Sequence, residues 1–479
     1  MEKCGIRWSV RDQRLDSSEV WAAATYATAA LPDARLNKRL AFVASVMAAR
    51  PLDSFPQAFE GWGDAKGAYR LIENERVTIE SIRDPIAGKA ARDCSGKERI
   101  YAIQDTTTLR FANSATMEGL GPIDKEDSEA RGMFLHSTLA VDENGLAIGV
   151  LDQQYWCRDP DEKGKKHLRA QLPLEAKESV KWLLGIEAAR RVIGENVEPD
   201  QRPRLIHVFD REGDIHEILE NIVNSPDGAV IRSAQNRRIE EEDEVAHAHA
   251  AVRKAPVLAT LSVNVKPKKD QKERVARVEL RACEVVLNPS SSTIRRKSPI
   301  SLFLVEVWEP KPPEGAERLH WRLWTTEKAD DPEGACWVVD TYRKRPQIEE
   351  MHLILKSGCR IEELQFETAE RTAKVVAIYV SVAIRLLQLR TRARVEPDAP
   401  CTVILTEAEW HTLYVAIHRK PLPKNIRPPT LRQAVLWIGR LGGHLNRKRD
   451  GMPGVRTLWR GWRDLNLMLP IYQAGKSSR

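Results

Sequence analysis

The sequence has 479 residues and a net charge of +7, with 42% hydrophobic and 30% charged residues, which predicts two to four domains and a large core. Its seven cysteines are scattered, odd in number and without a C-x-x-C pair, which argues against structural zinc and for a reducing compartment. Because we see no apolar signal segment, and because the longest apolar run (Val375 to Ile384) is too short to cross a bilayer, we expect a cytoplasmic bacterial protein without a membrane partner.

The positive charge gathers in the last part of the chain. Residues 401–479 hold fourteen Lys and Arg against four Asp and Glu, a net of +10, so the preceding 400 residues sum to −3. A basic tail on a nearly neutral body favours a polyanionic partner or an interaction arm, although solubility alone would also explain it.

Residues 1–95 are predicted to form a helical domain. Asp33 can cap a helix over residues 34–50, whose apolar residues recur at helical spacing. Arg35 and Arg39 are i,i+4 neighbours on another face of that helix, and Arg70 follows in the segment GDAKGAYRLIENERV. These arginines could contact DNA phosphates and base edges, or they could be ordinary surface charge, which periodicity alone favours.

Two aspartates stand at the ends of predicted strands within residues 96–236. An apolar alternation in RIYAIQDTTTLRF ends on Asp105, and a second strand in RLIHVFDREGDI ends on Asp210. Three antiparallel strands followed by α/β alternation are expected here, which is an α/β layer pattern. The other elements predicted in this region are strands over 136–142 and 146–156 around an Asn-Gly turn, helices over 178–192 and 215–223, and a strand over 229–232.

Residues 237–315 interrupt this pattern. The segment LATLSVNVK (258–266) and residues 274–287 alternate apolar and polar side chains, as half-buried antiparallel strands do. The α/β pattern resumes over residues 316–392, and a proline-dotted linker then leads to a helical segment that ends the chain.

The segment WVVDTYRKRPQIEEMHLILKSGCR (337–360) carries four polar residues on one side of a predicted helix. Spacings of three, four and seven place them in a sector of about 60°. This side is either a solvated surface with i,i+4 pairs or a carboxylate among cations that could serve a metal and a polyanion. The four residues are Tyr342, Arg345, Glu349 and Lys356.

Asp105, Asp210 and Glu349 together supply what a two-metal phosphoryl-transfer site needs. Carboxylate oxygens are the ligands that Mg²⁺ and Mn²⁺ prefer, and two ions about 4 Å apart can stabilise the attacking and leaving oxygens. We therefore take these three residues as the candidate catalytic and metal-binding set.

At these residues the sequence resembles the DDE transposases of the insertion-sequence-four family. The pattern Y-x-x-R-x-x-x-E-x6-K over residues 342–356 resembles the family's YREK signature. The segments DTT (105–107) and DREGD (210–214) resemble the blocks around its two aspartates. The resemblance runs nearly from end to end, and the three blocks in this order are specific.

The resemblance implies an α/β fold with an RNase H-like catalytic core over residues 96–236 and 316–392. An antiparallel β subdomain would be inserted over residues 237–315. Helical domains would flank the core: residues 1–95 to bind transposon ends, and residues 393–479 for dimerisation.

The resemblance also implies the activity. A homodimer with two Mg²⁺ ions, for which Mn²⁺ can substitute, would cut and paste double-stranded DNA through end nicking, hairpin formation, hairpin resolution and strand transfer. Catalysis and metal binding would fall to Asp105, Asp210 and Glu349. DNA contacts would fall to Tyr342, Arg345, Lys356, Trp321, Arg232, Arg211, Arg35, Arg39 and Arg70.

Three positions qualify this resemblance. Trp321 matches a tryptophan on which a flipped base stacks during hairpin formation, although a half-buried strand aromatic would look the same. Pro346 replaces a bulky residue thought to fill the gap left by that base, and because proline lacks an amide N–H the helix is expected to kink or restart there. Lys66 stands where an acidic residue is expected, so the recognised end sequence should differ.

Two further carboxylates near the candidate set are interpreted as secondary. Glu350 lies about 100° round the helix from Glu349, so it is the less favoured ligand. Asp214 is interpreted as the cap of the following helix.

Other functions have weaker support. Glu349-x-x-His352 and Glu244-x-x-His247 resemble a di-iron bundle motif, which would need four facing helices, and the pair His247 and His249 is more simply solvated. A catalytically inactive DNA-binding inhibitor and a standalone RNase H-like nuclease stay open as alternatives to a transposase. No Walker A or G-x-S-x-G motif is present, so ATP dependence and serine hydrolysis have no support.

Overall fold

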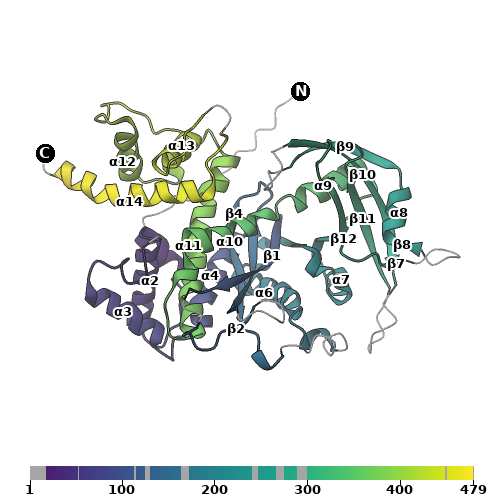
Figure 1. Cartoon of the computed structure of the whole chain (residues 1–479), viewed down its shortest axis with the longest axis horizontal. Helices are drawn as coiled ribbons and strands as arrows, with labels where there is room; N and C mark the ends of the chain where they lie inside the picture. The colour runs from purple at the N-terminus through teal and green to yellow at the C-terminus, as the bar shows by residue number, and fades with distance from the viewer. Residues whose placement is uncertain are drawn as a thin grey trace.

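The computed structural model describes residues 18–51, 53–112, 115–123, 130–162, 172–239, 246–265, 274–288, 299–447 and 450–477. Figure 1 shows a sheet with N-terminal helices on one side, a β-rich insertion on the other and C-terminal helices above. The helices are α1 (Ser18–Thr25), α2 (Ala34–Ala49), α3 (Trp62–Glu73), α4 (Ile79–Asp93), α6 (Val180–Asn196), α7 (His216–Val223), α8 (Ala248–Lys254), α9 (Pro332–Tyr342), α10 (Pro346–Leu353), α11 (Ala369–Val395), α12 (Glu407–His418), α13 (Leu431–Leu441) and α14 (Val455–Ser477). The strands are β1 (Arg99–Arg110), β2 (Gly121–Pro122), β3 (Arg131–Val141), β4 (Ala147–Trp156), β5 (Arg204–Phe209), β6 (Gly228–Arg232), β7 (Arg238–Ile239), β8 (Ala246–His247), β9 (Val257–Val265), β10 (Arg274–Leu287), β11 (Ile300–Trp308) and β12 (His320–Thr325).

Five strands form the part of the sheet that holds both aspartates, in the order β4-β3-β1-β5-β6. β3 is antiparallel to β1 and β4, whereas β5 and β6 continue the sheet parallel to β1. Parallel neighbours need a crossover connection, which α6 and α7 provide before β5 and β6. The predicted hairpin is present, and Gly145 in its turn has φ of +83°, which only glycine adopts without strain. The expected succession of strands and helices is therefore confirmed.

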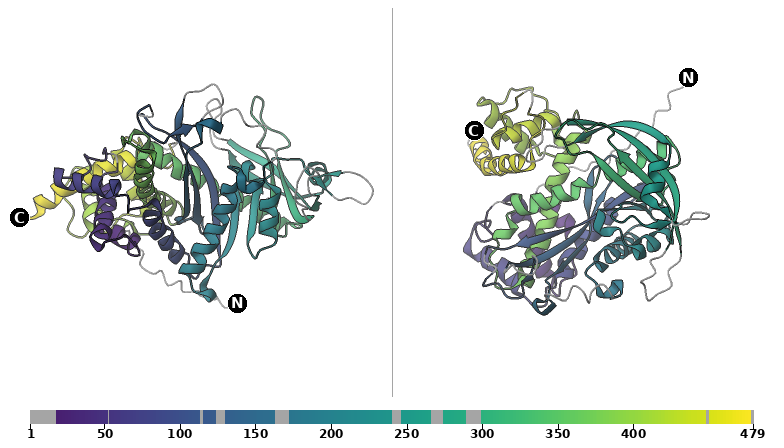
Figure 2. Two further views of the ribbon diagram at one scale, coloured as in Figure 1. Left: turned by 90° about the horizontal axis from the view of Figure 1, so that it is seen from below. Right: turned by 45° about the vertical axis from the view of Figure 1, so that its right-hand side comes forward.

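The insertion extends the same sheet. From β6 the order continues through β12, β11 and β10 to the short strands β7 and β8, while β9 pairs with β10. Glu306 on β11 is fully buried. Its charge is balanced by Arg253 and Arg322, and the His320 ring lies 2.9 Å from the same carboxylate. The sheet visible in Figure 2 thus carries the insertion as a continuation of the α/β core.

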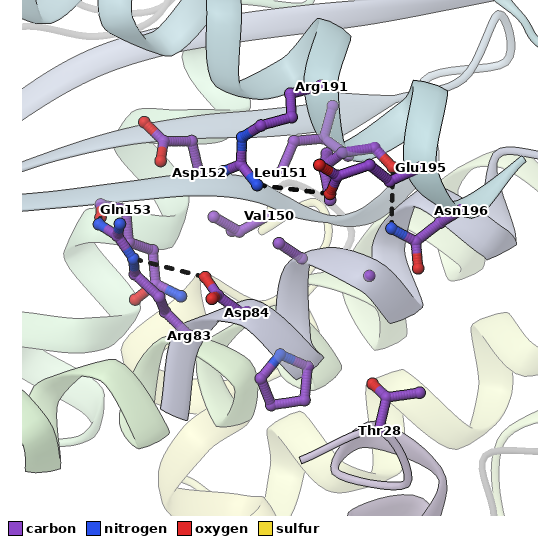
Figure 3. A pocket seen from close by; sticks show the side chains of 14 residues that line it. Thr28, Arg83, Asp84, Val150, Leu151, Asp152, Gln153, Arg191, Glu195 and Asn196 are labelled. Atoms are coloured by element: carbon purple, nitrogen blue, oxygen red, sulfur yellow. Dashed lines mark hydrogen bonds and ion pairs between the residues drawn. The ribbon is translucent and has the colours of Figure 1, made fainter. Parts of the chain in front are cut away.

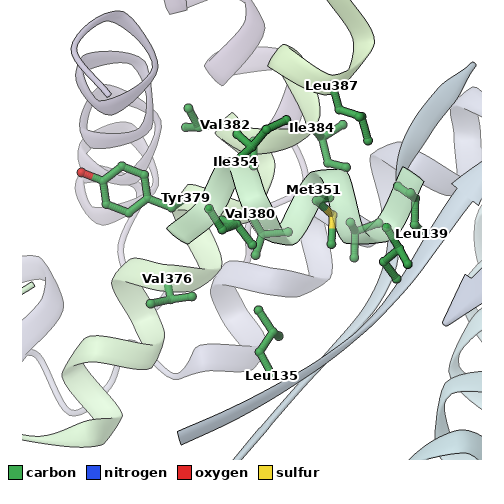
Figure 4. Packing of buried hydrophobic residues seen from close by; sticks show 14 of the residues in the cluster. Leu135, Leu139, Met351, Ile354, Val376, Tyr379, Val380, Val382, Ile384 and Leu387 are labelled. Carbon is green, nitrogen blue, oxygen red and sulfur yellow. The ribbon is translucent and has the colours of Figure 1, made fainter. Parts of the chain in front are cut away.

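The 27-residue helix α11 forms the centre of the helical side. It contacts α2, α4, α10 and β4, and Figure 4 shows its side chains meeting Met351 of α10 and Leu135 of β3 in one apolar cluster. By length and composition α11 is the one helix among the described residues that could cross a membrane, but 89% of its apolar window is buried inside the protein. It is a core helix, as predicted for its apolar run.

Helices α13 and α14 cross closely because two glycines allow it. A Cβ atom on Gly461 would lie 1.7 Å from the carbonyl oxygen of Ile438, and one on Gly442 would lie 1.9 Å from that of Thr457. Backbones approach this closely only where no side chain intervenes.

We therefore expect Gly461→Ala to push α14 away from α13 and to lower the melting temperature of the full-length protein by several degrees. Gly475→Ala, in the same helix but with nothing within 4 Å of its Cβ position, is the matched control. It should leave the melting temperature unchanged or slightly raise it, since alanine favours a helix by about 1 kcal/mol over glycine. Equal effects of the two substitutions, followed by circular dichroism, would contradict this account.

Candidate catalytic site

The adjacent parallel strands β1 and β5 bring the two aspartates side by side, toward the C-terminal end of each strand. Ile103 of β1 pairs with Val208 of β5, and Asp105 and Asp210 each follow two residues later in the same direction. The prediction that the first strand ends on Asp105 is wrong, because β1 continues to Arg110 and Asp105 lies within it. Asp210 directly follows β5, as predicted, and accepts a hydrogen bond from the Glu212 amide at 2.8 Å. Both carboxylates are thus placed by the backbone of the sheet.

Pro346 divides the segment that carries the candidate glutamate. α9 ends at Tyr342 and α10 begins at Pro346, which occupies the first turn where its missing N–H has no cost. Residues Ile354–Gly358 then form one π-helical turn. The expectation of four residues on one continuous helix face is therefore wrong, whereas the expected restart at Pro346 is confirmed.

Arg345, at the start of α10, joins the three candidate carboxylates. Its Nη2 lies 3.1 Å from Asp105 Oδ1 and 3.4 Å from Asp210 Oδ2. Its Nη1 donates a hydrogen bond to Glu349 Oε1, one helical turn further on. The Arg345 side chain is only 11% exposed, whereas that of Glu349 is 56% exposed. The Arg345 guanidinium therefore forms ion pairs with all three candidate carboxylates, Asp105, Asp210 and Glu349.

The pKa shifts of the two aspartates, Asp105 and Asp210, have opposite directions. Burial opposes ionisation of Asp105, but the nearby His352 ring and the charge of Arg345 outweigh it and lower the Asp105 pKa. For Asp210 the burial effect prevails and raises the pKa, despite the Glu212 amide and Arg345. Burial also opposes the charge of Arg345, yet the carboxylates around it raise its pKa.

His352 is a member of this group that the sequence analysis did not assign to it. Its Nδ1 lies 3.7 Å from Asp105 Oδ2, and its side chain is 7% exposed. The nearby histidine of β3, His136, is buried between Gln104 and Thr106, and burial lowers its pKa to about 3. The only sequence signal for His352 was its position three residues after Glu349.

The donor set suits a hard divalent cation. Three carboxylates from β1, from the end of β5 and from α10 already converge on one positive charge. They surround Arg345 without forming a cluster of their own, and within the described ranges no three carboxylate, imidazole or thiol groups are close enough to share an ion. An ion bound by all three carboxylates would take the place of the Arg345 guanidinium.

Four other predicted DNA contacts lie along the elements around this group. The rings of Tyr342 and Trp321 meet edge to face at 5.6 Å, and burial raises the Tyr342 pKa. Arg232 donates to the carbonyl of His320 at 3.2 Å, beside Trp321. Lys356, whose pKa burial lowers, donates to the carbonyl of Thr108 on β1.

Arg211 and the N-terminal arginines lie apart from the carboxylates. Arg211 is exposed in the turn after Asp210, and its side chain has no hydrogen-bond or ion-pair partner among the described residues. Arg35 and Arg39, on α2, are paired with Asp33 at 2.7 Å and Asp64 at 3.1 Å. Arg70 on α3 is exposed; α2 and α3 lie on the side of the protein away from the insertion (Figure 1).

The two secondary carboxylates behave differently from each other. Glu350 turns toward α11, where Arg390 Nη1 lies 2.6 Å from its Oε2, in keeping with its lower rank as a ligand. The prediction that Asp214 caps the next helix is wrong. Its carboxylate instead accepts hydrogen bonds from the amides of Ala234 and Gln235 and pairs with Arg237, so it fastens the loop after β6.

The histidines of the alternative metal-binding motifs lie away from the candidate carboxylates or are held by other side chains. His249 meets the Ser233 hydroxyl at 2.9 Å and Arg322 at 3.3 Å, and burial lowers its pKa to about 4. β8, which ends at His247, lies at the far end of the sheet order from β1. Glu244 falls outside the described residues.

A cavity of about 160 Å³ lies elsewhere, between α4, β4 and α6 (Figure 3). Its walls include Asp84 and Asp152, whose pKa values burial raises, and the oppositely charged Arg83 and Arg191. None of the three candidate carboxylates lines it. The three candidate carboxylates lie outside any enclosed pocket described here, and Glu349 is 56% exposed. Such an open arrangement suits a polymeric substrate better than a small molecule.

Two segments of the chain match known protein families. Residues 18–77 match the family model described as transposase DNA-binding, and residues 381–477 match the one described as Transposase Tn5 dimerisation domain. Together the matches support a DNA transposase that binds DNA and forms a homodimer. The second match supports a transposase similar to that of Tn5. Neither match includes Asp105, Asp210 or Glu349, so their role is argued from geometry.

Replacing Arg345 tests the charge balance of the group. Because the Asp105 pKa is lowered in the folded state, its ionisation stabilises the protein above the unfolded pKa of about 3.9, and this contribution is lost as pH falls through the folded pKa. Arg345→Met should therefore lower the melting temperature by several degrees at pH 7, with a deficit that persists down to about pH 4 and shrinks as pH falls below it.

The matched control is Arg343→Met, which removes an exposed ion pair with Asp340 and should have little effect at any pH. Melting curves across pH, followed by circular dichroism, give the comparison. A deficit of Arg345→Met that stays constant with pH would indicate lost packing instead of lost charge balance.

Proposed function

We propose that this protein is a Mg²⁺-dependent DDE transposase of the insertion-sequence-four type that moves DNA by cut-and-paste transposition. The observation that carries the proposal is the convergence of Asp105, Asp210 and Glu349 on one cationic position. The DNA-binding and dimerisation matches on either side of this group support a transposase over a standalone nuclease.

The strand order favours an RNase H-like core. Three antiparallel strands and two parallel strands follow the order β4-β3-β1-β5-β6, and the insertion begins after β6. The chain then returns through α9 and α10, which brings Arg345 to Asp105 and Asp210 and sets Glu349 against Arg345. In this reading the insertion separates the second and third acidic residues in sequence but not in space.

The acidic residues would hold two Mg²⁺ ions, for which Mn²⁺ can substitute. Bound there, the ions would supply the charge that activates water and stabilises the phosphoryl transition state. Asp105 is the most readily ionised of the two aspartates, because its pKa is lowered. Arg345 and Lys356 would bind DNA phosphates beside the cleaved bond, and guanidinium geometry suits a phosphate well.

Tyr342, Trp321 and Arg232 would form the neighbouring DNA contact. Trp321 is half-buried and held edge to face by Tyr342, so one side of a rigid aromatic pair is available to a base. Arg211, exposed after Asp210, would add a phosphate contact. The homodimer would act on paired transposon ends and then on target DNA, in the bacterial cytoplasm at the nucleoid.

The first test of the proposal is strand cleavage by the acidic variants. Full-length protein, Mg²⁺ and a duplex carrying the terminal repeats of its own element should give nicks, hairpins and joined strands on denaturing gels. Asp105→Asn, Asp210→Asn and Glu349→Gln should each slow cleavage by at least about 10³-fold, roughly 4 kcal/mol of transition-state stabilisation, while still binding the ends.

The control for this test is Asp340→Asn, an exposed carboxylate on α9 that should leave cleavage unchanged. Appreciable cleavage by any of the three variants would contradict the assignment. Binding without cleavage by the unaltered protein would favour a transposition inhibitor, and cleavage without joining would favour a nuclease.

A second test concerns the hairpin step. Trp321→Ala should slow hairpin formation about tenfold with little change in the first nick, because base stacking on an aromatic ring contributes about 1–3 kcal/mol. Trp308→Ala, at a tryptophan held between Arg253 and Arg318, is the matched control. Hairpins from the unaltered protein would show that Pro346 is compatible with base flipping, whereas an equal slowing of nicking and hairpin formation would remove the stacking role.

A further inference from the structure

The first turns of α14 contact the segment of the candidate site that carries Lys356. This segment is the single π-helical turn Ile354–Gly358 that follows α10, here called the π turn. We propose that Trp459 of α14 is a positioning residue, which holds the π turn in the geometry that Lys356 needs to bind a DNA phosphate. The inference rests on the proposed function and adds a residue of the C-terminal region to the site.

Trp459 lies against the main chain of the π turn. A Cβ atom on Gly358 would lie 3.3 Å from Cδ2 and Cε2 of the Trp459 ring, and Trp459 is 3% exposed. The absence of a side chain on Gly358 is what lets the indole come this close. Three residues earlier in α14, Arg456 Nη2 donates a hydrogen bond to Ser357 Oγ at 3.2 Å. Two consecutive residues of the π turn are therefore held by α14, one through packing and one through a hydrogen bond.

A π turn depends on such contacts because it departs from α-helical geometry. Turns of this kind are rare, occur mostly singly within helices and are frequent at functional sites. Here the amide of Cys359 donates to the carbonyl of Ile354 at 2.8 Å and closes the turn. Relaxation to α-helical geometry would rotate the residues of the turn about the helix axis, so the side chain of Lys356 would change direction.

The position of Lys356 is sensitive to such a rotation. Its Nζ donates to the carbonyl of Thr108 on β1 and lies 3.9 Å from Glu362 Oε1. The same Glu362 oxygen accepts a hydrogen bond from the Arg110 amide at 2.9 Å, at the end of β1. The ammonium group is thus held beside the strand that carries Asp105, and it stays there only while the π turn keeps its shape.

Helix α14 connects this turn to the C-terminal helices. Trp459 belongs to the apolar cluster that contains Ile354 of the π turn (Figure 4). Leu458 and Trp462 of the same helix belong to a separate cluster formed by the C-terminal helices. Because α14 lies within residues 381–477, the segment that matches the dimerisation model also holds part of the candidate catalytic site.

The first test measures hydrogen exchange by mass spectrometry on the full-length protein, without DNA or Mg²⁺. Trp459→Ala should speed exchange of the Cys359 amide by at least about tenfold, because the π turn then opens more often. Peptides that cover residues 350–362 report this exchange. Trp459→Phe keeps an aromatic ring near Gly358 and should recover most of the protection.

Trp462→Ala is the matched control. It removes the same kind of side chain from the same helix, at a residue that is 7% exposed but packs among the C-terminal helices. It should lower the melting temperature as Trp459→Ala does, and leave exchange of the π turn unchanged. Arg456→Gln alters an exposed side chain, so the protein should fold normally, and loss of the bond to Ser357 should speed exchange about twofold.

The second test asks whether Trp459 acts through Lys356 during strand cleavage. Lys356→Gln and Trp459→Ala should each slow cleavage about tenfold or more. The double variant should be no slower than Lys356→Gln alone, because the ring has no further effect once the ammonium group is gone. Any slowing by Trp462→Ala should instead multiply with that of Lys356→Gln, as effects of independent sites do.

Unchanged exchange of the π turn in both Trp459→Ala and Arg456→Gln would overturn the inference. Multiplying effects of Trp459→Ala and Lys356→Gln would also overturn it, because the ring would then act by another route. Both failures differ from failure of the proposed function, which would appear as normal cleavage by the acidic variants. Exchange is measured without catalysis, so it reports the hold of Trp459 on the π turn in either case.

Discussion

The structure around the candidate site depends on one positive charge among three negative ones. Two unit charges 4 Å apart interact by about 4 kcal/mol at an effective dielectric constant of 20, so three carboxylates near the sheet edge would repel one another strongly. The guanidinium of Arg345 balances them, and its several N–H donors let it face more than one carboxylate at once. The start of α10 therefore lies where Arg345 can contact both aspartates.

Pro346 fixes that position through the backbone. Because it has no N–H, α9 ends before it and α10 starts with it, so Arg345 stands at the junction and Glu349 follows one turn later. The other end of α10 is held by the apolar cluster with α11, to which Met351 and Ile354 contribute (Figure 4). A polar end and an apolar end thus hold the same short helix against the sheet.

Local patterns predicted much of this fold, and long-range contacts account for what they missed. Alternation and an Asn-Gly turn were enough for the hairpin, and Asp33 does cap α2 as expected. Asp214 had the local pattern of a helix cap, but its partners lie 20 or more residues further on, where no local signal reaches. His352 meets Asp105 only because α10 folds back onto β1.

The pKa values of the two aspartates shift in opposite directions. Arg345 and His352 lower the pKa of Asp105, whereas burial still raises that of Asp210. Under the proposed function, Arg345 cannot serve the carboxylates and a DNA phosphate with the same N–H groups. A phosphate that drew it away would leave the carboxylates with less positive charge and a greater affinity for divalent cations. By linkage, ion binding would in turn release Arg345 for DNA, so each ligand would favour the other.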